Sequence, residues 1–253
     1  MNVIDPADQL SQSPAGGSTP GAAAPVAMEA ARQLRAPWAA SVAGLLFAIL
    51  FTAALLLLRS QPMLDATDAE LVRQFATGQD LAGVIGGLYL APFAGIMFLW
   101  FIAVIRDQIG EREDRFFSTV FLGSGLIFVA TLFAAVAAAS MPIVGVRYLG
   151  FARPSTREVE LARARSYTLL FAFGTRAAAV FLLAMSTIGI KSGVFPRWFA
   201  LAGYVIGVVL LVVVVFWDWA ILVLPAWVAL VSLYILRRER SRRRTTSLGT
   251  RES

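Results

Sequence analysis

The chain has 253 residues, of which 58% are hydrophobic and only 15% are charged. Soluble domains contain roughly 45–50% apolar and about 25% charged residues, so the composition excludes an ordinary soluble protein and indicates a membrane protein. The chain has no cysteine and no histidine, which excludes disulfides, zinc fingers, iron–sulfur clusters and catalysis by a thiol or an imidazole. We therefore expect a non-enzymatic protein with no metal and no cofactor.

The net charge of +6 does not indicate nucleic-acid binding, because the basic residues lie beside apolar segments and not on one polar domain. They are expected to fix the topology of the chain in the membrane. Of the 22 basic residues only Lys191 is a lysine, an arginine bias typical of GC-rich bacterial genomes. The expected location is therefore the bacterial plasma membrane, crossed several times.

The first residues of the chain are expected to form no regular structure. Residues 1–36 are rich in Ala, Pro, Gly and Ser and have no apolar periodicity, which predicts a disordered tail. A cleavable signal peptide is not expected, because the first apolar stretch lies far from Met1 and, at about 20 residues, is too long for one.

Four apolar windows reach the roughly 20 residues that a helix needs to cross the hydrocarbon. They are Pro37–Leu58, Leu81–Ile105, Phe116–Ser140 and Tyr167–Ile190. A fifth stretch, Trp198–Leu236, would be about 58 Å long as one helix, so it must fold back. The turn is predicted at Phe216–Trp219, where Asp218 lies between two tryptophans suited to the membrane interface.

These windows predict an all-α fold, a polytopic bundle of six transmembrane helices over residues 37–236. Counting Arg and Lys near the span ends places both termini in the cytoplasm, with residues 237–253 as a basic cytoplasmic tail. Thirteen basic residues then lie inside and seven outside. Five of the outer seven belong to the third loop, namely Arg147, Arg153, Arg157, Arg163 and Arg165.

The third loop, residues 141–166, is expected to contain the start of a helix, because Ser155 and Glu158 have the spacing of a capping box. Arg157, Glu160 and Arg163 follow at helical spacing, which fits a solvated extension of the fourth span. A binding platform on the outer surface is the alternative. The charges scatter around the helix and leave no clean apolar face, which favours the solvated extension.

Small residues recur at every fourth position in several spans, a pattern that lets helices approach closely in lipid. Examples are Gly44 in the first span, Gly95 in the second, and Gly203 and Gly207 in the fifth. The pattern favours close packing within one chain. The alternative is that these small residues pack helices of different copies together in a homo-oligomer.

A candidate intramembrane polar site comprises Arg176, Asp218, Tyr89 and Pro92. Pro92 removes a backbone hydrogen bond in the middle of the second span and predicts a kink. With Tyr89 one turn before it, the alternative is a broken helix that exposes carbonyls to a solute, as in transporters. No span core contains a carboxylate, which disfavours proton-coupled transport.

Arg176 is the only charge inside a span, and an isolated charge at that depth costs at least about 2.5 kcal/mol. It is therefore expected to face the bundle interior and find a partner. Asp218 is the preferred partner, while Tyr89, helix carbonyls and water are the alternatives. A structural clamp is favoured over an anion-binding site, because no second cation is predicted beside Arg176.

Three segments carry a resemblance to known proteins: Arg115–Gly125, Arg176–Gly189, and Gly193–Trp198 followed by Gly203 and Tyr204. They resemble a family of multi-pass bacterial membrane proteins, chiefly actinobacterial, that has no established activity. The likeness covers most of residues 37–236. It implies a six-helix topology and a bacterial membrane, and it assigns no catalytic residue.

The expected function is that of a non-enzymatic accessory or scaffold component, which needs a packed core and a protein partner. The alternative is a small-solute permease with a polar path near Pro92 and Arg176. The basic tail is expected to attract anionic lipid at about 1 kcal/mol per nearby basic residue.

Reporter fusions test the predicted orientation. Fusions at Asp68 and Thr156 should report an extracellular location and a fusion at Glu111 a cytoplasmic one, because the basic residues near the span ends favour that orientation. A cytoplasmic signal at Thr156 would overturn the predicted topology. This site is the informative one, because the third loop carries five arginines, which disfavour an extracellular location.

Overall fold

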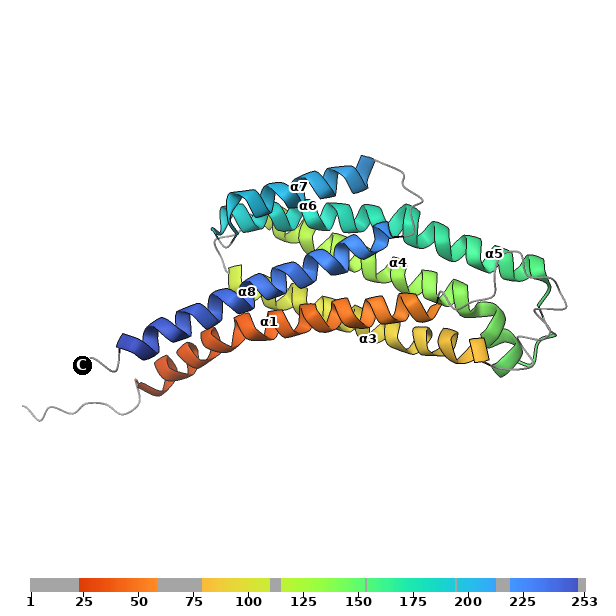
Figure 1. Cartoon of the computed structure of the whole chain (residues 1–253), viewed down its shortest axis with the longest axis horizontal. Coiled ribbons are helices and arrows are strands. Elements are labelled where there is room, and N and C mark those ends of the chain that lie inside the picture. The colour runs from red at the N-terminus through yellow and green to blue at the C-terminus, as the bar shows by residue number, and fades with distance from the viewer. Residues whose placement is uncertain are drawn as a thin grey trace, which may run out of the picture. The chain divides into compact units, whose positions relative to one another are not determined.

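The computed structural model describes residues 23–58, 79–109, 115–152, 154–193, 195–212 and 219–249. These residues are almost entirely helical, and no strand occurs among them (Figure 1). The predicted all-α class is therefore confirmed. The chain divides into two units, Met1–Arg35 and Ala36–Ser253, and the second unit contains the helical bundle.

The helices follow the predicted spans closely. Their bounds are α1 Ala23–Leu58, α3 Gln79–Ile109, α4 Arg115–Tyr148, α5 Thr156–Tyr167, the π-helix η3 Thr168–Gly174, α6 Thr175–Lys191, α7 Arg197–Val212, the 3₁₀-helix η4 Ala220–Leu222 and α8 Val223–Gly249. Helices α5, η3 and α6 follow one another without interruption. Among the described residues, five helical segments are long and apolar enough to cross a membrane, and α7 is a shorter apolar helix.

Part of the N-terminal segment that the sequence predicts to be disordered is helical. Helix α1 begins at Ala23, inside the segment 1–36 expected to be disordered, whereas residues 1–22 lie outside the described part of the chain. The physical reason is composition, because residues 26–35 contain several strong helix formers, Ala, Met, Glu, Gln, Leu and Arg.

The third loop is shorter than predicted. Helix α4 continues past Ser140 to Tyr148, because the residues after Ser140 are apolar up to Arg147 and Pro142 is accommodated inside the helix. The predicted helix start is confirmed, since α5 begins after Ser155 with a capping box. The Ser155 amide and hydroxyl donate to Glu158 Oε2 at 2.8 and 3.0 Å.

The last apolar stretch is divided between two helices, as its length required. Helix α7 ends at Val212 and η4 begins at Ala220. Most of the predicted turn, including Asp218, lies outside the described residues. A hydrogen bond of 2.6 Å between the hydroxyls of Thr187 and Tyr204 joins α6 to α7.

Phenylalanine side chains fill the centre of the bundle. Phe98 of α3 lies 4.5 Å from Phe47 of α1, 5.5 Å from Phe128 of α4 and 4.9 Å from Phe181 of α6, measured between ring centroids. These four side chains are fully buried. Because lipid is as apolar as the protein interior, helices in a bilayer are held together by dispersion contacts of this kind and not by the hydrophobic effect.

Close approach at glycine, predicted from the sequence, occurs within this chain. A Cβ atom at Gly44 would collide with Ser232 Oγ of α8 and lie 2.9 Å from Phe101 Cδ2 of α3. One at Gly207 would lie 2.9 Å from the Leu183 side chain of α6. The small residues at these two positions therefore serve packing inside one bundle.

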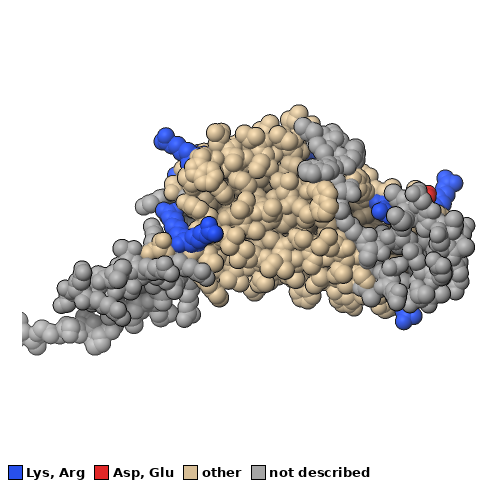
Figure 2. Space-filling model, in the orientation of Figure 1, with Lys and Arg blue, Asp and Glu red and all other residues tan. Residues whose placement is uncertain are grey.

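On the face shown in Figure 2, the charged side chains of the described residues lie toward two ends. The face shown in Figure 2 has Lys and Arg at both ends and an uncharged region between them. At one end, Arg106 Nε donates to Ser118 Oγ at 3.1 Å, and Lys191 Nζ lies 4.3 Å from the centroid of the Phe117 ring. An apolar belt between charged ends is the distribution expected of a protein embedded in a membrane.

Replacing Gly44 tests whether the bundle depends on this close approach. Gly44→Ala should lower the free energy of unfolding by about 1–3 kcal/mol, because the new methyl group overpacks the contact between α1, α3 and α8. The measurement is thermal unfolding in detergent. Gly123→Ala is the matched control, because nothing lies within 4 Å of a Cβ there, and equal losses in the two variants would contradict the packing role.

Candidate functional site

Tyr89 and Pro92, two members of the predicted polar site, lie on the surface of α3. Tyr89 is 64% exposed and Pro92 is also exposed, so neither side chain faces the bundle core. Helix α3 continues through Pro92. The alternative of a helix broken at this proline is therefore not what the structure shows.

Arg176 is half-buried and bonded to its own helix. Its Nη1 donates to the carbonyl oxygens of Phe171 at 3.1 Å and Ala172 at 2.9 Å. Thr175 Oγ1 donates to the same Phe171 carbonyl. Both acceptors belong to the π-helix η3. Of the partners considered for Arg176, helix carbonyls are therefore the ones observed among the described residues.

The pairing of Arg176 with Asp218 stays a prediction, because Asp218 lies outside the described residues. The residues that follow it are described, and η4 packs against η3. The last hairpin is thus held near the segment whose carbonyls bind Arg176. This contact is compatible with a clamp between the fourth span and the last hairpin.

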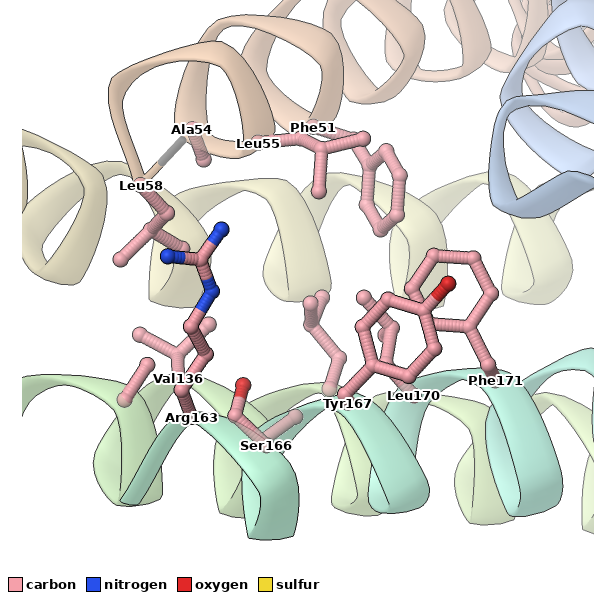
Figure 3. Close-up of a pocket in the computed structure, with 13 residues that line it drawn as sticks. Phe51, Ala54, Leu55, Leu58, Val136, Arg163, Ser166, Tyr167, Leu170 and Phe171 are labelled. Atoms are coloured by element: carbon pink, nitrogen blue, oxygen red, sulfur yellow. The ribbon is translucent and has the colours of Figure 1, made fainter. Parts of the chain in front are cut away.

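A cavity of about 260 Å³ opens between α1, α4 and the segment formed by α5 and η3 (Figure 3). Thirteen residues line it, and ten of them are apolar: Phe51, Ala54, Leu55, Leu58, Leu132, Ala135, Val136, Ala139, Leu170 and Phe171. The other three, Arg163, Ser166 and Tyr167, come from α5. The cavity is thus an apolar chamber with one charged and two hydroxyl side chains.

The polar lining residues are distributed along this cavity. Arg163 extends from α5 toward Leu58 at the end of α1, whereas Tyr167 and Phe171 lie toward the other end, opposite Phe51 (Figure 3). The Tyr167 ring stacks on the Phe171 ring with 4.1 Å between centroids and an interplanar angle of 23°. This contact orients the Tyr167 hydroxyl.

The sequence contained part of the signal for this cavity. Arg163, Ser166, Tyr167 and Leu170 follow helical spacing and share one face, but the sequence assigns Arg163 to a solvated extension and Tyr167 and Leu170 to the fourth span. That interpretation holds for Arg157 and Glu160, which are exposed, but not for Arg163, which is half-buried. The opposing walls from α1 and α4 are apolar and give no signal distinct from ordinary core residues.

A second cavity, of about 490 Å³, lies between the end of α4 and α5. Its two charged lining residues, Glu158 and Arg165, have opposite signs, and Glu158 already accepts hydrogen bonds from Ser155. The second cavity therefore has no net charge to select a ligand.

Comparison of the chain with known proteins finds no matching family model, no similar curated protein and no matching solved structure. The class of the protein follows from its own structure, which is that of a helical, membrane-embedded protein. Its function is therefore inferred from the geometry alone.

A double-mutant cycle tests the clamp. Arg176→Leu should lower thermal stability in detergent, because two carbonyls of η3 lose a charged donor, and hydrogen bonds to charged groups contribute about 1.5–3 kcal/mol. Asp218→Asn should also lower it, and the double variant should lose less than the sum. Additive losses would exclude the pair, and unchanged stability in Arg176→Leu would favour an anion site.

Proposed function

We propose that the protein is a non-enzymatic accessory or scaffold component of the bacterial plasma membrane. It crosses the membrane six times with both termini in the cytoplasm, and α7 and α8 form the last two spans. The observation that carries the proposal is the packed aromatic centre of the bundle.

The aromatic centre fills the place where a solute would have to pass. Phe47, Phe98, Phe128 and Phe181 come from four different helices and have no exposed surface. Their edge-to-face and tilted ring contacts are the arrangements that aromatic pairs favour. Opening a path between these helices would require several of the contacts to separate together.

Two of the buried hydroxyl groups bond to carbonyls of their own helix, whereas Ser186 Oγ and Ser232 Oγ are buried without a hydrogen-bond partner among the described residues. Ser124 Oγ donates to the Phe121 carbonyl at 3.1 Å, and Ser140 Oγ donates to the Val136 carbonyl at 2.6 Å. Each hydroxyl thus satisfies its own helix, which is a common role of serine within a membrane. In a permease, such hydroxyl groups are expected to point toward one solute path between the helices.

A small-solute permease remains the alternative function. It was expected to have a polar path near Pro92 and Arg176, but Pro92 is exposed and Arg176 donates to helix carbonyls. The accessory role therefore fits the described residues better.

Helix α8 supports the orientation proposed for the C-terminus. It runs on beyond the apolar part of the last span to Gly249, so the arginines of residues 237–244 follow the membrane directly. Such a cluster favours the cytoplasmic side and attracts anionic lipid headgroups.

Labelling of introduced cysteines distinguishes an accessory protein from a permease. The chain has no cysteine, so Ser124→Cys and Ser232→Cys each introduce one buried thiol with little change in volume. In sealed membrane vesicles of either orientation, a membrane-impermeant maleimide should not label these thiols, because a packed core admits no water. Labelling after denaturation shows that each thiol is present.

Ala152→Cys is the control, because Ala152 is exposed in the loop between α4 and α5 and should be labelled from one side. Labelling of Ser124→Cys or Ser232→Cys in native membranes would establish a water-filled path and favour the permease. Affinity purification from the same membranes should recover a stoichiometric partner protein if the accessory role is right.

A further inference from the structure

We propose that the tip of the hairpin formed by α4 and α5 docks a segment of a partner protein that carries both carboxylates and apolar side chains. The hairpin tip is defined by four exposed apolar residues, Tyr148, Leu149, Phe151 and Leu161. The proposal rests on the proposed accessory function and names the surface that binds the partner. It follows from the position of the tip relative to the bilayer, from its exposed apolar area and from its charge.

The hairpin tip lies outside the bilayer. The helix from Thr156 to Lys191 has 36 residues and is about 54 Å long, whereas the hydrocarbon is about 30 Å thick. Its apolar part begins at Tyr167, so Thr156 lies about 16 Å beyond the hydrocarbon, and the headgroups account for about 5–8 Å of this. A tilt of about 20° shortens that height by only about 1 Å.

The end of α4 lies at the same level as the start of α5. Helix α4 packs against α5, and Tyr148 and Thr156, where the two helices end and begin, lie at the same end of the bundle (Figure 1). The short loop between them therefore lies beyond the headgroups as well.

Apolar side chains of the hairpin tip face water. Tyr148, Leu149 and Phe151 are each more than 60% exposed, and Leu161 is 46% exposed. Exposed apolar residues within the spans contact lipid, but residues at the height of the tip have no lipid to cover them. A cluster of exposed apolar residues in contact with water is typical of a protein interaction site.

The turn after α4 holds these side chains in a fixed arrangement. The amides of Leu149 and Phe151 both donate to the Gly145 carbonyl, at 3.2 and 3.1 Å. Gly150 lies between them with a φ of +68°, a left-handed conformation that glycine adopts without strain. The Phe151 ring packs on Gly145, where a Cβ would lie 2.9 Å from Phe151 Cδ2. A preorganised surface of this kind loses little conformational freedom on binding.

The second cavity, of about 490 Å³, belongs to the same surface. Nine of its eleven lining residues are apolar or glycine, and Phe151 and Leu161 are among them. The cavity therefore offers a recess for apolar side chains of the partner. An apolar centre with charged residues at its edge is the usual arrangement of a protein interface.

The charge of the hairpin tip selects an acidic partner. Arg147, Arg157 and Arg165 are exposed and have no acidic partner among the described residues. Arg157 and Arg165 precede and follow Leu161 by four residues each, so they lie on the same face of α5 with the leucine between them. Carboxylates of a partner complement this arrangement, and arginine is enriched at protein interfaces.

The acidic residues of α5 do not neutralise this surface. Glu158 already accepts hydrogen bonds from Ser155, which leaves Glu160 as the other carboxylate among the described residues of the tip. A second copy of the chain, docked through the same surface, would bring arginines against arginines. The charge therefore favours a different protein over a homodimer.

Photo-crosslinking in intact cells tests the proposal. The probe is benzoylphenylalanine in place of Leu149 of the full chain, and the same probe in place of Leu230 is the control, because Leu230 is 52% exposed within the apolar span of α8. Irradiation should join position 149, but not position 230, to another protein. Peptide mapping should place the cross-link in a segment of that protein with carboxylates and apolar residues.

Variants of the arginines test the role of charge. Replacing Arg147, Arg157 and Arg165 together by Gln should lower the yield of the adduct about tenfold, because each exposed ion pair contributes up to a few-fold. The matched triple variant with Lys at these positions keeps the charges and should retain most of the adduct. Thermal unfolding should be the same in both variants, since the three side chains are exposed.

Several results would overturn the proposal. They are no adduct at position 149, an adduct with lipid or with a second copy, a cross-link within the chain, and equal protein adducts at positions 149 and 230. Equal yields in the Gln and Lys variants, or a mapped segment without carboxylates, would do the same.

The cross-link and the labelling of buried thiols fail independently. Labelling of Ser124→Cys refutes the packed core and the accessory role, while an adduct at position 149 still establishes the contact at the hairpin tip. An unlabelled Ser124→Cys without an adduct leaves the accessory role standing and removes the hairpin tip as its binding surface.

Discussion

A polypeptide that crosses a bilayer must satisfy its backbone hydrogen bonds within the protein, because the hydrocarbon offers no donors or acceptors. The all-helical fold follows from this constraint, and so do finer details of the bundle. Ser124, Ser140 and Thr187 return their hydroxyls to carbonyls of their own helices. Arg176 does the same with two carbonyls of the π-helix η3. A charge that would be costly alone in lipid is therefore satisfied by carbonyls of its own helix.

Packing in lipid depends on shape, because moving an apolar surface from lipid to protein releases little free energy. The bundle has two kinds of close contact that supply dispersion energy. Rings such as Phe98 and Phe128 fill the centre, and Gly44 and Gly207 bring helix backbones together. The two devices complement each other, because glycine lets neighbouring helices approach while aromatic side chains fill the remaining space.

The spans could be predicted from the sequence because hydropathy is summed over about 20 residues and tolerates local error. The helix start at Ser155 was predictable for a different reason, since a capping box is a local interaction. The end of α4 was placed too early, at Ser140, whereas the helix continues through Pro142 to Tyr148. Tyr89 was assigned to the interior without information on its face, and it is exposed. The cavity joins three segments distant in sequence, and no local pattern specifies such a juxtaposition.

Arg163 and Arg176 lie on the same continuous helix, from Thr156 to Lys191, but at different positions along it. Arg176 lies within the apolar segment and donates to backbone carbonyls. Arg163 lies where the helix leaves the apolar segment, and its side chain extends into a cavity whose other lining residues carry no charge (Figure 3). An arginine within an apolar segment is costly unless its donors are used within the protein, and the two carbonyls of η3 meet this requirement for Arg176.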